Sequence, residues 1–233
     1  MDNLIRSYIT NPIETVELLL LEDGKCEVLK YTSRNPFPSN SRPDLDVTEE
    51  LVPELLSWYL QLVGILRWDI ELGRIDIFHE TSLMSQYHTN TSIGHLEVLY
   101  HILAYLKSHM KMGRICYDPM RLNVNFSVFN NNTDWMEFYG DVQEYLPPNI
   151  PEPRGIALSI YQFVDADRAG NVVTRRSHTD IIIFIQKAPI IWFSKKNNLV
   201  KADTFGNELV ALRIRKNLIV TLRYTLRMFS VRL

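Results

Sequence analysis

The sequence predicts an α+β protein in which a small all-α helical module is followed by a β-β-β-α unit. Two changes of pattern carry this prediction. Apolar residues recur at helical spacing in residues 46–110, and from Ile156 onward they alternate with a period of two before one final helical segment. The composition is that of a globular chain, because 46% of the 233 residues are hydrophobic and 22% are charged.

Residues 1–45 are predicted to hold a short helix, a strand and a linker. Asn11-Pro12 is typical of a helix start, and residues 26–31 alternate as a strand does. Three prolines among Ser, Asn and Arg then mark residues 33–43 as an exposed linker. We therefore place the first boundary near residue 45.

Three helices are predicted in residues 46–110, which we call the helical module. The first, over residues 55–68, is apolar almost all round, so most of its surface is expected to be buried. The second covers residues 75–87. The third covers residues 92–109 and carries four leucines on one face.

Residues 111–153 are predicted to be a Pro-rich tether, and residues 154–233 the β-β-β-α unit. Asp203 or Thr204 is expected to cap a long helix that runs to about residue 229. The three strands are expected at residues 156–165, 179–186 and 190–194. A tight turn at residues 187–189 is expected to join the last two.

Several classes of protein are disfavoured by the sequence. The apolar runs are far shorter than the roughly 20 residues of a membrane-spanning helix, and the N-terminus lacks the basic-then-apolar pattern of a secretion signal. Cys26 and Cys116 have neither the number for a disulfide framework nor the paired spacing of a zinc site. We expect a cytoplasmic or nuclear protein without a membrane partner.

Charge is distributed unevenly along the chain. Residues 154–233 hold 14 Lys/Arg and 5 Asp/Glu, a net charge of +9, which leaves −11 for residues 1–153. We call these the basic half and the acidic half. A basic half favours a polyanionic partner such as nucleic acid. The alternative is that the two halves attract each other.

Two carboxylates of the basic half are candidates for metal chemistry. Asp165 ends the first predicted strand, and Glu208 lies in the first turns of the long helix. Alone, each is ordinarily a turn residue or a solvated residue. If the helix packs across the sheet, the two approach each other, and a divalent cation such as Mg²⁺ would relieve their repulsion. Such carboxylates hold the ions of two-metal phosphodiester hydrolysis.

The chain resembles the Pol polyproteins of copia-type LTR retrotransposons from about residue 45 to residue 233. In the basic half the resemblance lies in FVDADRAG (163–170), TRRSHT (174–179) and PIIWFSKK (189–196). In the helical module it lies in LVG (62–64), RIDI (74–77), SQY (85–87) and ILAYLK (102–107). It implies that the helical module follows a reverse transcriptase palm, with residues 1–45 a post-palm remnant and linker. Residues 154–233 would then be the truncated, ribonuclease H-like first half of a ribonuclease H domain.

The resemblance also implies roles for individual residues. The family's first catalytic aspartate falls on Asp165, and its catalytic glutamate, in a Glu-x-x-Ala pattern, falls on Glu208. Both would be Mg²⁺ ligands, whereas Asp167 is expected to be a local structural or auxiliary carboxylate. The expected nucleic-acid contacts, to an RNA–DNA hybrid or a single strand, are Arg175, Arg176, Lys195 and Lys196; the alternative for the two arginines is an exposed basic loop.

The sequence also departs from the family pattern. The polymerase pair of aspartates and the later ribonuclease H carboxylates are absent from this chain. Asp180 stands where the family usually has glycine. Arg215 lies on or beside the packing face of the long helix, where an unpaired buried charge would be costly. His178 is expected to be structural, and Trp192 is expected to be a core residue.

We therefore expect a fragment of a reverse transcriptase/ribonuclease H polyprotein. The parent activity would be RNA-templated DNA synthesis and Mg²⁺-dependent cleavage of RNA in RNA–DNA hybrids. The remainder of the polyprotein would be a partner. This chain alone is expected to be inactive and to bind Mg²⁺ only weakly. The alternative is a non-enzymatic nucleic-acid-binding or interaction protein derived from the same remnant.

Overall fold

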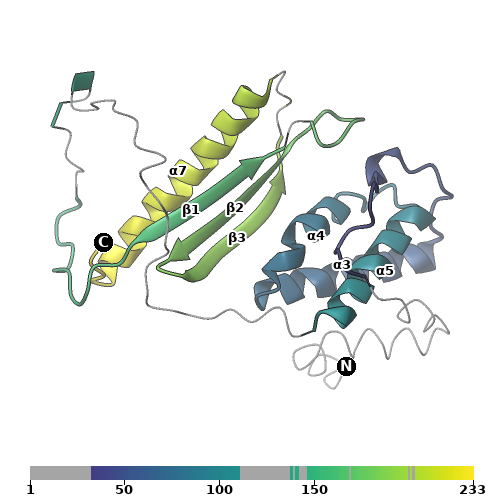
Figure 1. The fold of residues 1–233 in the computed structure, drawn as a ribbon, viewed down its shortest axis with the longest axis horizontal. Helices are drawn as coiled ribbons and strands as arrows, with labels where there is room; N and C mark the ends of the chain where they lie inside the picture. The colour runs from purple at the N-terminus through teal and green to yellow at the C-terminus, as the bar shows by residue number, and fades with distance from the viewer. Residues whose placement is uncertain are drawn as a thin grey trace.

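The computed structural model describes residues 33–110, 137–138, 140–141, 146–167, 169–198, 200 and 203–233. The helix and strand predicted within residues 1–32, and most of the predicted tether, lie outside the described residues. The described part is a mixed α+β structure, with a group of helices beside a three-stranded antiparallel sheet that carries one long helix (Figure 1).

The helical module is built from α3 (Pro53–Glu71), α4 (Phe78–Met84) and α5 (Ile93–Ser108). Two 3-10 turns, η2 (Pro43–Leu45) and η3 (Ile75–Ile77), precede α3 and α4. The first and third predicted helices are confirmed. The second is shorter than predicted, because residues 75–77 form a 3-10 turn and the α-helix ends at Met84.

The core of the helical module is aliphatic and aromatic. The α3 helix turns most of its apolar residues inward, and η3, α4 and α5 cover them. The side chains of this core with essentially no exposed surface are Tyr59, Leu62, Leu66, Ile77, Met84, Leu99, Ile102 and Leu106. Burial of this kind contributes roughly 1.5–3 kcal/mol for each large apolar side chain.

The sheet contains β1 (Ile160–Ala166), β2 (His178–Ile185) and β3 (Ala188–Lys196) in the order β1-β2-β3. The turn between β2 and β3 lies at Gln186 and the residue after it, earlier than predicted. Pro189 belongs to β3, opposite Phe184 at a shift of register. A proline is tolerated there because β3 is an edge strand and its outer N–H groups have no ladder partner to lose.

The long helix α7 (Thr204–Met228) begins as predicted, with the Asp203 side chain accepting a hydrogen bond from the Gly206 backbone N–H at 2.5 Å. It packs on one face of the sheet, mainly along β1. The helical module lies against the other face through α4 and β3. Of the α7 residues, only Asn207 and Ala211 are fully buried, so much of this helix contacts solvent.

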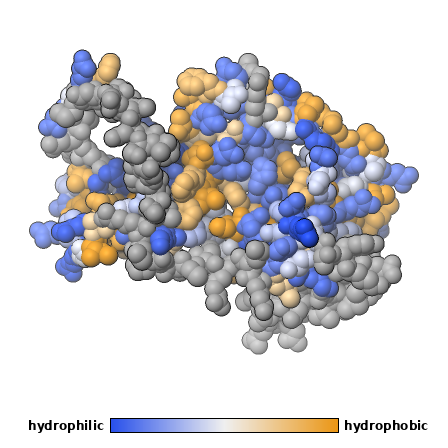
Figure 2. Space-filling view, viewed as in Figure 1, coloured by the Kyte–Doolittle hydropathy of each residue, from blue (hydrophilic) through white to orange (hydrophobic). Residues whose placement is uncertain are grey.

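Polar and apolar residues are mixed over the surface of the strands and the helices in Figure 2. Among the described residues, no helix combines the length and the apolar character needed to cross a membrane.

Truncation of Leu66 tests the core of the helical module. Leu66 is fully buried in α3, so L66A is expected to lower the free energy of unfolding by about 2–5 kcal/mol. The matched control is Leu60 on the same helix, which is 46% exposed; L60A is expected to cost about 0.5 kcal/mol. Urea denaturation followed by circular dichroism measures both, and equal losses would contradict this assignment of the core.

Candidate nucleic-acid interface

The four cations expected to contact nucleic acid gather at one end of the sheet. Arg175 and Arg176 lie in the loop from β1 to β2, and Lys195 and Lys196 end β3. The register of β2 and β3 places Lys196 opposite His178, two residues after Arg176. We call these four residues the basic end.

The basic end carries positive charge that its surroundings do not neutralise. Arg175, Arg176 and Lys195 are exposed, and Lys196 is half-buried. Within the part of the chain that the structure describes, none of the four forms an ion pair with an acidic side chain. Burial, together with the charge of Arg176, lowers the pKa of Lys196. The arrangement suits a polyanion that supplies the missing negative charge.

The loop that carries the two arginines is closed by Asp167. The Asp167 Oδ1 accepts a hydrogen bond from the His178 backbone N–H at 2.5 Å, and the Asp167 N–H donates to the His178 carbonyl oxygen at 3.2 Å. A Cβ at Gly170 would collide with the same carboxylate, so a side chain at this position would displace Asp167 from its present place. This geometry agrees with the structural role expected for Asp167.

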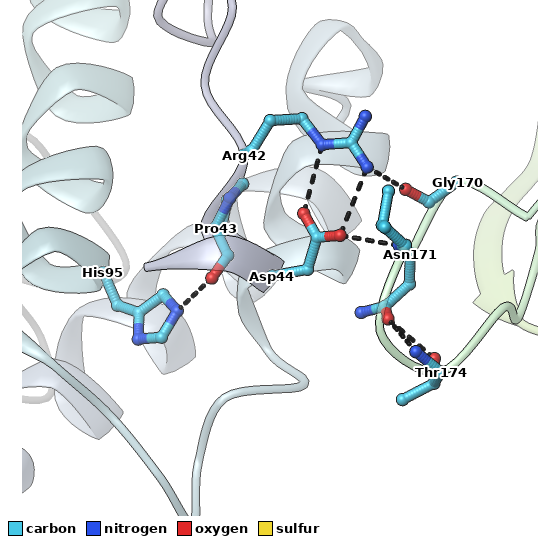
Figure 3. A network of polar contacts seen from close by, with 8 residues as sticks. Arg42, Pro43, Asp44, His95, Gly170, Asn171 and Thr174 are labelled. Carbon is cyan, nitrogen blue, oxygen red and sulfur yellow. Dashed lines mark hydrogen bonds and ion pairs between the residues drawn. The ribbon is translucent and has the colours of Figure 1, made fainter. Parts of the chain in front are cut away.

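The acidic half holds the outer side of this loop through two residues (Figure 3). Arg42 donates to the Gly170 carbonyl oxygen at 3.1 Å, and Asp44 accepts from the Val172 backbone N–H at 2.6 Å. Arg42 and Asp44 also pair with each other at 3.2 Å. The loop is therefore fixed through its backbone, and this contact leaves the arginine side chains at its tip unneutralised.

The segment before α3 is itself anchored on α5. His95 Nδ1 accepts from the Ser92 backbone N–H at 3.0 Å, so its Nε2 carries the proton and donates to the Pro43 carbonyl oxygen at 2.8 Å. The imidazole ring also stacks on Tyr87. Thus the start of α5 positions Arg42 and Asp44 against the loop of the sheet.

Asp165 and Glu208 lie at the same end of the unit but on opposite faces of β1. Gln162 contacts Arg215 of α7, so by the alternation of a strand Asp165 faces away from the helix. Asp165 lies about 10 Å from Gln162 toward the end of β1. Glu208 lies about 10 Å from Arg215 toward the start of α7. Figure 1 shows the first turn of α7 beside the arrowhead of β1.

The surroundings of the two carboxylates also differ. Asp165 is exposed and accepts a hydrogen bond from the Ala166 backbone N–H at 3.0 Å, while Glu208 is half-buried. The described residues contain no group of three or more His, Cys, Asp or Glu side chains arranged to hold a metal ion. The alternation along β1 places Asp165 and Glu208 on opposite faces of that strand, and their joint role as metal ligands stays a prediction.

A polar cluster joins the helical module to the sheet. His79 Nδ1 of α4 pairs with Asp180 Oδ2 of β2 at 2.7 Å. Beside it, Ser82 donates to the Ser194 carbonyl oxygen at 2.8 Å. We call the faces joined here the module–sheet interface.

Two further contacts extend the module–sheet interface. Gln86 Nε2 lies 2.9 Å from His178 Nε2, and Trp192 Nε1 donates to the Ile70 carbonyl oxygen at 3.1 Å. The structural role expected for His178 agrees with these contacts. Trp192, however, is half-buried at the interface rather than part of a closed core.

The charges at the module–sheet interface are set by these contacts. The hydrogen bond with Asp180 raises the pKa of His79, although burial opposes it. Burial opposes ionisation of Asp180, but the hydrogen bond from His79 and the other polar contacts and charges around the carboxylate together outweigh it and hold the pKa of Asp180 below its usual range. Burial lowers the pKa of His178 to about 4, so this ring is neutral near pH 7 and accepts from Gln86. Burial raises the pKa of both Glu80 and Asp167 nearby.

Asp180 and Arg215, the two charged residues that depart from the family pattern, both have polar partners in the structure. Asp180 pairs with His79, and Arg215 Nε donates to Gln162 Oε1 at 2.6 Å. Neither His79 nor Gln162 is among the residues for which the sequence predicts a role. The available signal was a pair of misplaced polar residues: Gln162 interrupts an apolar strand face, and Arg215 lies on the helix face that covers it.

Comparisons of the chain with protein-family models, with curated proteins and with solved structures give no match.

The pair of His79 and Asp180 predicts a pH-dependent coupling between the helical module and the sheet. Since the pKa of His79 is raised, the stabilisation is complete below the ordinary histidine pKa of about 6.5 and is lost as the pH rises through the raised value. The lowered pKa of Asp180 keeps that carboxylate ionised at pH 5.5 and at pH 9 alike. A double-mutant cycle with H79Q and D180N is expected to give a larger coupling energy at pH 5.5 than at pH 9.

The coupling is measured by urea denaturation of the wild type, the two single variants and the double variant at both pH values. His88 provides the control, because it is exposed and has no hydrogen bond or ion pair among the described residues. A cycle with H88Q and D180N is expected to give no coupling. The same coupling energy for His79 and Asp180 at both pH values would contradict an ion pair.

Proposed function

We propose that the chain is a piece of a copia-type retrotransposon Pol polyprotein, joining the segment after the reverse transcriptase palm to the first half of a ribonuclease H-like domain. The order of elements supports this proposal: three antiparallel strands in sequence are followed by a helix that packs on the first of them. The family's catalytic positions fall on Asp165, next to the last residue of β1, and on Glu208, in the first turns of α7.

The proposed activity of this chain is the binding of nucleic acid without base readout. One observation carries this proposal: the cations of the basic end have no acidic partner among the described residues, although the acidic half lies directly beside them. The ion pair between the halves runs in the opposite sense, with the cation His79 on the acidic half and the anion Asp180 on the basic half. Attraction between the two halves therefore does not neutralise the positive charges of the basic end.

Cleavage of RNA in a hybrid would belong to the parent protein rather than to this chain. Two-metal hydrolysis needs several carboxylates around a common point. This chain offers two at the family's positions, and β1 separates them. The residues present thus do not fit a tightly held Mg²⁺, and we assign no catalytic step to them.

The second candidate function is a non-enzymatic interaction protein. The contacts between the helical module and the sheet favour it: His79 and Ser82 of α4 bond to the sheet, and Trp192 of β3 donates to the Ile70 carbonyl oxygen of α3. Such a docked arrangement provides a fixed surface for a protein partner. The two candidates differ in whether salt controls binding to nucleic acid.

Removal of charge from the basic end tests the proposed binding. A single-stranded 20-nucleotide DNA is titrated at 50 and 200 mM salt with the wild type and with the double variant R176Q/K195Q. Binding to the wild type is expected to be micromolar or weaker and to fall with salt, with a log–log slope of about −0.7 per phosphate neutralised. The double variant is expected to lower the magnitude of that slope by about 1.4.

The matched control is R67Q/R213Q, which removes the same charge from exposed residues outside the basic end. Its salt slope is expected to remain close to that of the wild type. Equal changes in both double variants would show a diffuse electrostatic effect. Binding that is insensitive to salt would favour the interaction protein.

Incubation with a labelled RNA–DNA hybrid and Mg²⁺ tests the assignment of catalysis to the parent. No Mg²⁺-dependent cleavage is expected from the purified 233-residue chain, because its two candidate carboxylates lie on different faces of β1. Cleavage by the wild type that disappears in both D165N and E208Q would overturn this expectation. Cleavage that persists in both variants would point to a contaminating nuclease.

A further inference from the structure

A pocket of about 380 Å³ lies between β1 and the middle of α7. It is on the sheet face opposite the helical module, so it is distinct from the module–sheet interface. Its lining comes from two residues of β1 and four of α7: Ile160, Gln162, Leu212, Arg215, Lys216 and Ile219. The space falls within the range of about 300–1,000 Å³ that is usual for small-molecule sites.

The lining is half apolar and half polar, and its charge has one sign. Ile160, Leu212 and Ile219 supply aliphatic surface, while Arg215 and Lys216 supply two positive charges. Among the described residues, no acidic side chain lines the pocket, and neither cation forms an ion pair with an acid. A polar group that enters this space would have to be neutral or negative.

The Arg215 guanidinium is held in place before any ligand arrives. Its Nε donates to Gln162 Oε1 at 2.6 Å, which ties the half-buried arginine to the neighbouring strand. This bond uses one of the five N–H donors of the side chain. The Gln162 amide nitrogen is itself buried and has no acceptor among the described residues. The polar wall therefore has more donors than acceptors.

The mouth of the pocket remains open because α7 is incompletely covered. Leu212 is 44% exposed, and Leu209, one turn earlier, is 49% exposed. A ligand that buried the side chain of Leu212 would add apolar contact to the charge contact. Such a combination favours a molecule with an anionic head and an apolar body.

We propose that this pocket binds a small organic anion, a molecule with a carboxylate or phosphate head on Arg215 and Lys216 and a short apolar body against Ile160, Leu212 and Ile219. A planar guanidinium pairs with either head through two parallel hydrogen bonds. The apolar half of the lining distinguishes this ligand from an inorganic anion. It also distinguishes it from a nucleic-acid backbone, which the exposed basic end would bind without such a lining.

The probes are octanoate and octyl phosphate, each compared with octanol and with inorganic phosphate by isothermal titration calorimetry of the full chain. Both alkyl anions are expected to bind at least tenfold more tightly than octanol, which lacks the charge, and than phosphate, which lacks the apolar body. R215Q is expected to weaken the binding of octyl phosphate at least tenfold, since it removes a hydrogen bond between charged groups. R213Q, at an exposed position of α7 that does not line the pocket, is the charge-matched control and is expected to change affinity less than threefold.

A second pair of variants covers the case in which R215Q perturbs the packing of α7. L212E places a negative charge in the lining, and L209E places the same charge on a similarly exposed leucine outside it. L212E is expected to abolish binding of both alkyl anions, whereas L209E leaves it within threefold of the wild type. Circular dichroism establishes that all four variants are folded.

Three results would overturn the proposal. Octanol that binds as tightly as octanoate would show a purely apolar groove. Equal losses in L212E and L209E, or in R215Q and R213Q, would show that general surface charge controls binding. Displacement of octyl phosphate by a 20-nucleotide DNA whose own affinity falls in R215Q would make the pocket part of a polyanion surface instead.

Discussion

The placement of a charged residue inside an apolar strand sets the arrangement of the rest of this structure. Asp180 directly precedes the isoleucines of β2, and its carboxylate is largely removed from water. An isolated buried carboxylate is costly, so the position demands a cation or a proton. His79 supplies the cation from another element. The contact thereby fixes which face of the sheet the helical module covers and leaves the other face to α7.

The two faces of the sheet consequently have different chemistry. On the face of the helical module, polar groups meet across an interface: His79 with Asp180, and Ser82 with the backbone of β3. On the face of α7, contacts are mainly aliphatic and include one polar bridge from Arg215 to Gln162. Both bridges place a long-range polar bond at a position where an apolar residue would be expected. Replacing both partners of such a bond by well-packed apolar groups is often nearly neutral for stability. Removing one partner leaves the other polar group buried without a hydrogen bond and lowers stability.

Local patterns in the sequence predicted the elements well and their mutual arrangement poorly. The cap of α7 at Asp203 and the apolar helices α3 and α5 follow from rules that act over one or two turns. Alternation along β1 also placed Asp165 on the face opposite Gln162. Which of those faces α7 would cover is a long-range outcome that this alternation does not determine; in the structure Arg215 of α7 meets Gln162. No local pattern around Asp165 and Glu208 determines whether their side chains converge.

The segment that leads into β1 lies beside the segment that follows α7. Arg154 forms a parallel bridge with Val231, and the Leu158 N–H donates to the Arg232 carbonyl oxygen at 2.8 Å. The first and last residues of the β-β-β-α unit thus lie side by side. Adjacent ends of this kind are typical of units that tolerate insertion into a larger protein. Such a segment can act as its own cooperative unit in local unfolding. Separation of the helical module from the sheet would then expose the module–sheet interface, while the backbone contacts between the two ends of the β-β-β-α unit remain in place.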